Sequence, residues 1–442
     1  MFGIFLVQSW YEASRGYAIG ASSFDQVPLT GMKVLCVLSR HNYGDPRRGG
    51  GYEYTNFIPT LKRLGHEVHF LESRDRLCHR SFIELNRALL QQVEQVRPDV
   101  VLAVLTYYEI WLETWEILRE SGLCATINWT TDDSWRYSQF SRWVAPSFHA
   151  FTTTYAECFT QYQRDGIHHV LLTQWAANAD HLQPPLPASE CRYPVTFVGT
   201  AHGKRKAWVE AAQRKGANTE CFGHGWPNGS VTSEQIPQII RQSVISLNFA
   251  NGAWVWNGLR LVQKNQIKAR TFEVPGAGGF LLTENAEGLD RFYQPGREVA
   301  VFADVDELVQ QIRRYLSCPQ ERDAIAQAGF ERTCREHTYD RRLAETLQFA
   351  LTQKERFRTT RTGHPSGAID WRRFEQVVKR HALNRPLKAL RRLLLAGCSA
   401  LWGPIRGPRA ARRFLYEVSW RTVGRRTYCA AGWPGRLFYE AS

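Results

Sequence analysis

The sequence lacks the patterns that mark several common classes of protein. No apolar run reaches the roughly 20 residues that a membrane-spanning helix requires. Its ten cysteines stand singly, without a C-x-x-C pair or a Cys/His cluster at zinc spacing. These absences argue against a membrane-spanning helix and a structural metal, and they favour reduced thiols in a cytosolic protein.

Methionine is almost absent as well and occurs only at Met1 and Met32. Residues 1–31 have no basic segment ahead of a long apolar stretch, so a signal peptide is not expected. Because Met32 opens a strongly apolar segment, we hypothesise that it is the native start and that residues 1–31 are an extension. A native N-terminus upstream of Met32, measured by mass spectrometry, would exclude this hypothesis.

Apolar residues, by contrast, are abundant enough for a large core. Hydrophobic residues make up 43% of the 442 residues, and this length predicts two domains plus additional segments. The net charge of +14 is unevenly distributed: from Lys354 onward there are 20 Lys+Arg against 5 Asp+Glu, whereas the preceding residues are close to neutral. The basic character therefore belongs to the C-terminal tail.

Residues 32–183 alternate between short apolar segments and segments with helical periodicity. Strands are predicted at 32–39, 67–71, 99–105, 124–130, 148–154 and 169–175, with helices between them. A glycine loop at 49–51 separates the first strand from the first helix. This order predicts a Rossmann-like domain with a parallel sheet.

A Pro-rich segment, residues 184–194, is predicted to be the interdomain linker. A second alternating unit follows over residues 195–353, with closing helices at its end, and residues 354–442 form a basic helical tail. Ligands of such sheets bind at the carboxyl ends of the strands. We therefore expect the site in the cleft between the two domains.

The segment "KARTFEVPGAGGFLLTE" (residues 268–284) has R-x-F-E, a glycine-rich break and then LLTE. Residues 195–350 resemble the C-terminal domain of the glycosyltransferase group 1 proteins, which are family 4-like, and in particular their spore-maturation (CgeB-like) branch. A looser similarity covers residues 32–175 through "RGGGYEYTNFIPTLKRLGHEVHF". The resemblance implies the GT-B fold, in which two doubly wound Rossmann-like domains face a cleft. It also implies transfer of a sugar, of the hexosyltransferase type, from a nucleotide-diphosphate donor.

The resemblance implies that Glu273, five residues before Gly278, binds the ribose of the donor. An ionised carboxylate accepts hydrogen bonds from two vicinal hydroxyls, and glycine lets backbone approach a ligand closely. The alternative is a solvated glutamate at a helix end. The family's second glutamate is missing, because Asn265 occupies its position.

The diphosphate of such a donor requires cations. Lys204, Arg205 and Lys206 follow a predicted strand at the start of a helix, where backbone amides also favour anions. Arg205 is the strongest catalytic candidate because a fixed cation stabilises charge on the leaving phosphate, with Lys268 and Arg270 as its partners. The alternative is a basic helix start that is exposed to water.

The first domain is expected to hold the acceptor. Gly50 and Gly51 are candidates for close backbone approach, although a flexible loop explains them equally. Trp129 and Thr130 stand where many relatives have a histidine, and an aromatic ring beside carboxylates fits sugar binding. Asp132 and Asp133 are candidates for the base or for anchoring the acceptor, and an Asp pair that caps the next helix is the alternative.

The resemblance implies retention of the anomeric configuration, and since no nucleophilic carboxylate pair is evident, front-face attack is expected. No metal and no cofactor are expected, because cations hold the diphosphate and the nucleotide sugar is a substrate. His224, in "CFGHGW" (221–226), is expected near the base as a loop residue. A non-catalytic sugar-binding relative is the alternative function.

The basic tail suggests three roles. Residues 385–415 mix arginines with leucines and a tryptophan, which suits an anionic membrane surface with Leu393 to Leu395 and Trp402 buried. This fits a cytoplasmic enzyme, peripheral on the inner face of the membrane, whose acceptor is a lipid-linked or cell-envelope glycan. A polyanion or nucleic-acid binding module is the second reading, although no specific nucleic acid is expected because no recognised motif is present. Arginines on the solvated face of packed helices are the third.

Overall fold

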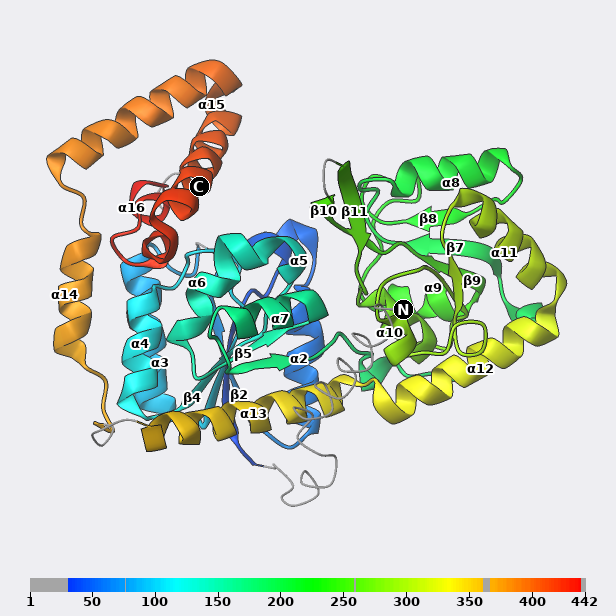
Figure 1. The fold of residues 1–442 in the computed structure, drawn as a ribbon, viewed down its shortest axis with the longest axis horizontal. Helices are drawn as coiled ribbons and strands as arrows, with labels where there is room; N and C mark the ends of the chain where they lie inside the picture. The colour runs from blue at the N-terminus through cyan, green and yellow to red at the C-terminus, as the bar shows by residue number, and fades with distance from the viewer. Residues whose placement is uncertain (1–30, 76, 258–259, 361–365, 439–442) are drawn as a thin grey trace, which may run out of the picture.

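The computed structural model describes residues 31–75, 77–257, 260–360 and 366–438. The proposed extension, residues 1–31, therefore lies almost entirely outside the described residues. Met32 directly precedes the first strand, β1 (Lys33–Leu38). Two α/β domains stand side by side, and a helical C-terminal segment lies against the first of them (Figure 1).

The first domain is built on a six-stranded sheet of order β2-β1-β3-β4-β5-β6 with all strands parallel. The remaining strands are β2 (Glu67–Glu72), β3 (Val100–Ala103), β4 (Ala125–Asn128), β5 (Ala150–Thr153) and β6 (Val170–Leu172). The central residues of β1, β3, β4 and β5 are buried on both faces, which is why these strands read as continuous apolar runs, whereas those of the edge strands β2 and β6 are only partly buried.

Helices cover both faces of this sheet. They are α2 (Tyr52–Arg63), α3 (Phe82–Val96), α4 (Leu112–Ser121) and α7 (Ala156–Arg164), with α5 (Asp133–Arg136), a π-helical turn (Tyr137–Ser141) and α6 (Arg142–Val144) after β4. Local chemistry sets their ends: Ser81 Oγ accepts a hydrogen bond from the Glu84 amide at the start of α3. Gly122, with φ of 72°, ends α4.

The second domain has a five-stranded parallel sheet of order β13-β12-β9-β7-β8. Its strands are β7 (Tyr193–Val198), β8 (Glu220–Phe222), β9 (Ser243–Asn248), β12 (Leu281–Glu284) and β13 (Ala300–Phe302). Its helices are α8 (Arg205–Arg214), α9 (Gln235–Arg241), α10 (Arg270–Gly276), α11 (Val305–Ser317) and α12 (Pro319–Glu336).

An antiparallel hairpin, β10 (Asn251–Asn257) and β11 (Arg260–Asn265), interrupts the alternation and was not predicted.

The chain crosses between the domains twice, near the same point. Residue Ala177 lies on the outward crossing, and α13 (Tyr339–Thr360) returns the chain and packs against α2, β4 and β5 of the first domain. The Ala177 amide donates to the His337 carbonyl and the Tyr339 amide donates to the Ala177 carbonyl, both at 2.9 Å. Most of α13 falls within the predicted second domain, residues 195–353, but its apolar residues join a core cluster that includes Phe57 and Trp129 of the first.

The tail folds as α14 (Trp371–His381), α15 (Arg385–Val423), a 3-10 turn (Gly424–Tyr428) and α16 (Trp433–Phe438). Phe374, Val377, Tyr416 and Tyr428 join the core of the first domain. Within the described part of the chain, no helix combines the length and apolar character needed to cross a bilayer.

Candidate functional site

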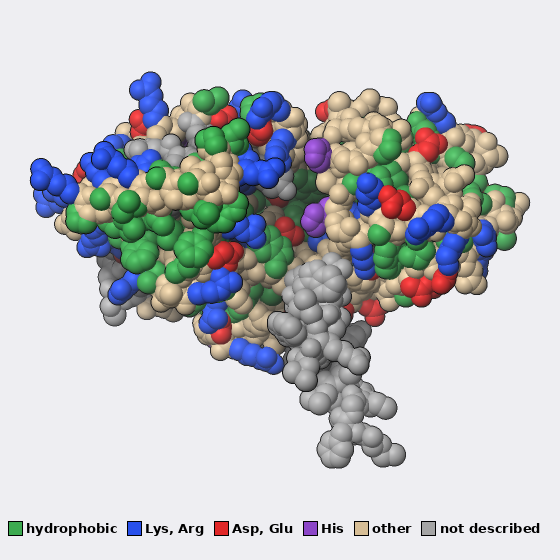
Figure 2. All heavy atoms as spheres, turned by 90° about the horizontal axis from the view of Figure 1, so that it is seen from above, with side chains coloured by type: hydrophobic (Ala, Val, Ile, Leu, Met, Phe, Trp, Pro, Cys, Tyr) green, Lys and Arg blue, Asp and Glu red, His purple; other side chains and the backbone are tan. Residues whose placement is uncertain are grey.

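A cavity of about 450 Å³ lies between the domains. Helix α2 forms one wall, and α9 and α10 form the other. Its lining includes Tyr52, Asn56 and Lys62 from α2, Ile236 and Ile240 from α9, and Arg270 and Glu273 from α10. Figure 2 shows the opening between the two halves from above. A ligand in this cavity would touch both domains.

Glu273 faces the first domain from α10. Its carboxylate pairs with Arg270 Nη1 at 2.6 Å, and each side chain is about one fifth exposed (19% and 21%). Burial raises the pKa of Tyr52 well above its usual value, and the negative charge of Glu273 raises it further. The Tyr52 hydroxyl in turn lies 3.0 Å from that of Tyr339. Glu273 is thus a partly accessible carboxylate between a guanidinium and two phenols.

The glycine break after Glu273 fits against the chain itself. Gly278 has φ of 76°, and a Cβ there would lie 2.5 Å from the Gln183 carbonyl oxygen. A Cβ on Gly276 would lie 2.6 Å from that of Ala177. The close approach that glycine permits here is made by the interdomain connection, which accounts for Gly278 without a ligand.

Arg270 lines the cavity, and Arg205 lies within electrostatic reach of both Arg270 and Lys268. Burial lowers the pKa of Arg205, and the positive charge of Arg270 lowers it further. Burial also lowers the pKa of Lys268, where the Asp132 carboxylate opposes the effect and the Arg205 charge adds to it. Arg205 is therefore repelled by both Arg270 and Lys268. Carboxylates also act on each cation: Glu284 on Arg205, Asp132 on Lys268 and Glu273 on Arg270. An anion bound among the three cations would relieve the repulsion between them.

Unpartnered polar atoms lie around the same cations. Among the described residues, the buried side-chain atoms without a hydrogen-bond partner include Arg205 Nε, both amide atoms of Asn251 and Asn265 Oδ1. Asn251 and Asn265 are opposite each other in the β10–β11 hairpin, and the Asn251 amide lies beside Gly203, two residues before Arg205. Buried polar atoms normally have partners, so this concentration indicates a place for a polar ligand.

Lys204 is engaged differently from Arg205. Its ammonium pairs with the carboxylate of Glu284, which is 1% exposed and also accepts from Asn265 Nδ2 at 2.9 Å and from the Ala250 amide at 3.0 Å. Glu284 ends β12, and its carboxylate contacts Asn265, which occupies the position of the missing glutamate. Glu284 is the last residue of the LLTE motif and is not among the predicted site residues. A charged residue closing an apolar strand is the signal that would have identified it.

In the first domain, Asp132 faces Lys268 of the second domain, since its charge acts on that ammonium. Its backbone is left-handed, with φ of 58° and ψ of 35°, and its side chain makes no capping hydrogen bond to α5. Asp is one of the few residue types that tolerate this conformation. Glu53, in the first turn of α2, was not predicted: burial raises its pKa, and the charge of Asp132 raises it further. The carboxylates of Glu53 and Asp132 in the first domain therefore lie within electrostatic reach of each other.

Asp133 is placed differently from its neighbour. Its side chain is fully buried and accepts hydrogen bonds from Ser141 Oγ at 2.5 Å and from the Tyr162 hydroxyl at 3.0 Å. Burial raises its pKa to about 6, against the effect of these hydrogen bonds. Asp133 therefore joins three segments of the first domain and is not part of the cavity lining.

Trp129 and Thr130 are also buried. The Trp129 ring packs on Phe57 and Trp175 with centroid distances of 5.1 and 6.1 Å, so it presents no ring face for stacking against a sugar. The Thr130 amide donates to Thr152 Oγ1 at 3.1 Å. Both residues serve the core in this structure.

The glycine loop packs against its own strand. The Gly51 amide donates to the Arg40 carbonyl at 2.7 Å, and a Cβ on Gly51 would lie 2.5 Å from the Ser39 carbonyl oxygen. The Gly50 carbonyl accepts from Asn42 Nδ2 at 2.8 Å. These contacts shape the loop that starts α2, and α2 in turn delivers Tyr52 and Glu53 to the cleft.

Two further sequence features have simple structural roles. The His224 carbonyl accepts from the Ala201 amide at 2.9 Å, which ties the loop after β8 to the loop after β7. The chain contains one D-x-D triplet, Asp304 to Asp306. Asp304 caps α11 and Asp306 pairs with Lys215, so the triplet is part of the helix start.

Comparisons with known proteins agree with the fold. Residues 204–348 match a family model described as "Glycosyl transferase-like". Sucrose-phosphate synthase from Thermosynechococcus elongatus is similar in structure, with a TM-score of 0.50 and 12% identity over 74% of this chain and 100% of that chain. Anabaena Alr3699/HepE in complex with UDP has a TM-score of 0.47 and 13% identity over 72% of this chain and 100% of that chain. No significant match is found among curated proteins. The fold is GT-B, as predicted, and the family match supports a glycosyltransferase-like second domain.

Proposed function

We propose that this chain is a nucleotide-sugar-dependent glycosyltransferase of the hexosyltransferase type, with retention of configuration and without a metal. The observation that carries the proposal is the repulsion of Arg205 by Lys268 and Arg270, the last of which lines the cleft, with unpartnered polar atoms nearby. Mutually repelling cations beside a partly accessible carboxylate suit a nucleoside diphosphate, which combines a polyanion with a diol.

Each residue has a role in this proposal. Arg205, Lys268 and Arg270 hold the diphosphate, and Arg205 stabilises the charge that grows on it as the sugar leaves. Glu273 accepts hydrogen bonds from the ribose hydroxyls. To do so, its carboxylate must give up part of its ion pair with Arg270. Lys204 and Glu284 shape the floor of the sugar subsite.

On the acceptor side, Asp132 receives the proton of the attacking hydroxyl, and Glu53 assists as its neighbour. Attack on the same face from which the diphosphate leaves gives retention without a covalent intermediate. The acceptor is a cell-envelope or lipid-linked glycan, and the enzyme acts in the cytoplasm, peripheral to the membrane. The R-x-F-E and LLTE motifs support the CgeB-like branch.

A thermal-shift screen of the purified protein against UDP, GDP, ADP and CMP tests the proposal. One nucleoside diphosphate is expected to raise the melting temperature by several degrees, because a ligand that binds only the folded state stabilises it by mass action. The shift is expected to disappear in Arg205→Ala and Glu273→Ala. Lys206→Ala is the matched control, since Lys206 lies at the same helix start with its side chain 62% exposed.

The outcomes separate the candidate functions. No shift with any nucleotide would overturn the nucleotide-sugar site. If Lys206→Ala loses the nucleotide-induced rise in melting temperature to the same extent, the rise reflects the overall positive charge of this surface and not a specific site. A specific shift without turnover of any sugar donor would favour a non-catalytic sugar-binding relative, the function that Asn265 in place of a glutamate suggests.

A further inference from the structure

The long C-terminal helix α15 is a hairpin of two helical arms. Gly403 has φ of 78° and ψ of 166°, which is not helical, and Pro404 follows it. Proline has no amide hydrogen and clashes with the preceding turn, so the chain reverses there. Figure 1 shows the two arms, in orange and red, running out from the first domain and back.

The arms pack on each other through a narrow apolar seam. Leu394, Leu395 and Cys398 of the first arm pack against a cluster formed by Ala411, Leu415 and Leu437. A Cβ on Gly407 would lie 2.5 Å from the Ser399 backbone, so glycine is what allows this approach. Leu394 and Leu395, which were predicted to enter a membrane, are therefore used between the arms.

The outer surface at the reversal is strongly apolar. Leu401, Trp402 and Ile405, here called the tip, are 74%, 52% and 77% exposed. Leu393 and Phe414 flank it on the two arms and are 71% and 61% exposed. Soluble surfaces rarely gather large apolar side chains in this way unless the patch is an interaction site.

The charge around the tip is of one sign. Residues 385–416 contain eight Lys+Arg and no Asp or Glu. Arginine stems can lie along an apolar surface while their guanidinium groups reach anions above it. Apolar side chains ringed by arginines match the boundary between the acyl chains and the headgroups of an anionic bilayer.

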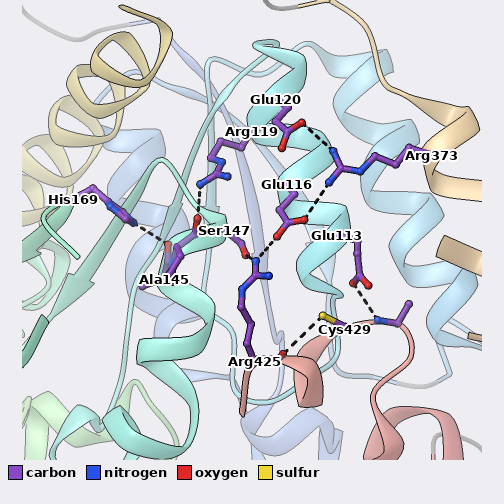
Figure 3. A network of polar contacts seen from close by, with 12 residues as sticks. Glu113, Glu116, Arg119, Glu120, Ala145, Ser147, His169, Arg373, Arg425 and Cys429 are labelled. Atoms are coloured by element: carbon purple, nitrogen blue, oxygen red, sulfur yellow. Dashed lines mark hydrogen bonds and ion pairs between the residues drawn. The ribbon is translucent and has the colours of Figure 1, made fainter. Parts of the chain in front are cut away.

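The base of the hairpin fixes its direction. Arg373 donates to Glu116 and Glu120 at 3.1 and 2.9 Å, and Arg425 pairs with Glu116 and donates to Ser147 Oγ at 2.9 Å (Figure 3). The Ala430 amide donates to Glu113 at 3.1 Å. These arginines are neutralised by the acidic face of α4, so the base is attached to the first domain and the tip is held away from it.

We propose that the tip docks on an anionic lipid bilayer. Figure 2 shows a band of hydrophobic side chains, bordered by Lys and Arg, over the half with the C-terminal helices, on the face where the opening between the halves is visible. Docking through this face would bring the cleft opening towards the lipid surface. A nucleic acid would use the arginines but would leave Leu401 and Ile405 without a role.

Vesicle sedimentation with the full-length protein tests the proposal. The probes are vesicles of phosphatidylcholine alone and of phosphatidylcholine mixed with an equal amount of phosphatidylglycerol. The wild type is expected to bind the mixed vesicles and not to bind the vesicles of phosphatidylcholine alone. A tip variant, Leu401→Ser with Trp402→Ser and Ile405→Ser, is expected to bind at least tenfold more weakly. The control is Leu172→Ser with Leu316→Ser, which changes exposed leucines on other elements and is expected to bind like the wild type.

A second measurement reports insertion directly. Lipids brominated on their acyl chains quench the fluorescence of a tryptophan that enters the bilayer. We expect this quenching in the wild type. It should be lost in Trp402→Phe, a substitution that keeps the tip apolar. Equal vesicle affinity of the tip variant and the wild type would overturn the proposal, as would binding of homopolymeric RNA but not of vesicles. A change of sedimenting mass in the tip variant would instead identify the tip as a contact between copies. Vesicle binding does not require the nucleotide site, so it succeeds or fails independently of the proposed activity.

Discussion

The two domains treat their predicted site residues in opposite ways. In the second domain, Arg205 lies within electrostatic reach of Lys268 and Arg270, and both Arg270 and Glu273 line the cavity. In the first domain, Trp129, Thr130 and Asp133 are buried and used in packing and hydrogen bonds. Glu273 is predicted from a motif with fixed spacing, and Arg205 from its place at a helix start. Trp129 and Thr130 are predicted from their residue types at a strand end where relatives have a histidine. Residue type near a strand end is therefore a weak guide, because the same groups also build cores.

The largest expected effect concerns the fold and not the reaction. Trp129→Ala is expected to lower the free energy of unfolding by about 3–5 kcal/mol, because a fully buried tryptophan leaves a cavity. Denaturant titration measures the loss. Trp135→Ala, at an exposed position after β4, is the control and is expected to change stability little. The fraction of Trp129→Ala protein that stays folded should bind nucleotide as the wild type does. Loss of nucleotide binding would mean that Trp129 belongs to the binding site.

Asp132 is the exception in the first domain, and its substitution tests whether that domain contributes to the chemistry. Asp132→Asn is expected to lower kcat about a hundredfold, or about 2.7 kcal/mol, the lower end of what a general base contributes. Asparagine also tolerates a left-handed backbone, so the melting temperature should not change. Steady-state kinetics on the donor identified by the thermal-shift screen measure the effect. Unaltered kcat would remove Asp132 from the mechanism.

Asp133 is expected to affect the pH dependence of the free energy of unfolding and not the catalytic activity. Its pKa is about 6 in the folded protein and roughly 3.9 in an unfolded chain. Its folded pKa is the higher one, so the stability it contributes is fully present below about pH 4 and is lost as the pH rises through about 6. The loss amounts to about 2–3 kcal/mol.

Denaturant titrations of the wild type and Asp133→Asn across this pH range measure this contribution. As the pH rises, the free energy of unfolding of the wild type should fall by that amount relative to that of Asp133→Asn. A parallel pH dependence in wild type and Asp133→Asn would contradict the buried titration.

Much of the fold was predictable because strand and helix periodicities are local. The predicted strand at 99–105 contains β3, and that at 124–130 contains β4. The β10–β11 hairpin was missed although an Asn-Gly pair at 257–258 between apolar runs is a strong hairpin signal.

Other features depend on pairing between distant segments and leave no local pattern. Tyr52 and Tyr339 are 287 positions apart, and their hydroxyls meet only because α13 returns to the first domain. The charge interaction between Glu53 and Asp132 likewise needs the assembled sheet. The arginines of the tail show the same limit, since Arg373 and Arg425 are neutralised by α4, whereas Arg406 and Arg409 lie in a stretch, residues 385–416, that has no acidic residue.

The paired crossing at Ala177 has a mechanical consequence. Two chain segments joined by reciprocal hydrogen bonds act as one two-stranded ribbon, which bends more readily than it shears. Relative movement of the domains would have to bend this ribbon, because both crossings of the chain pass through it. Tyr52 and Tyr339, whose hydroxyls meet close to the ribbon, would move least in such bending.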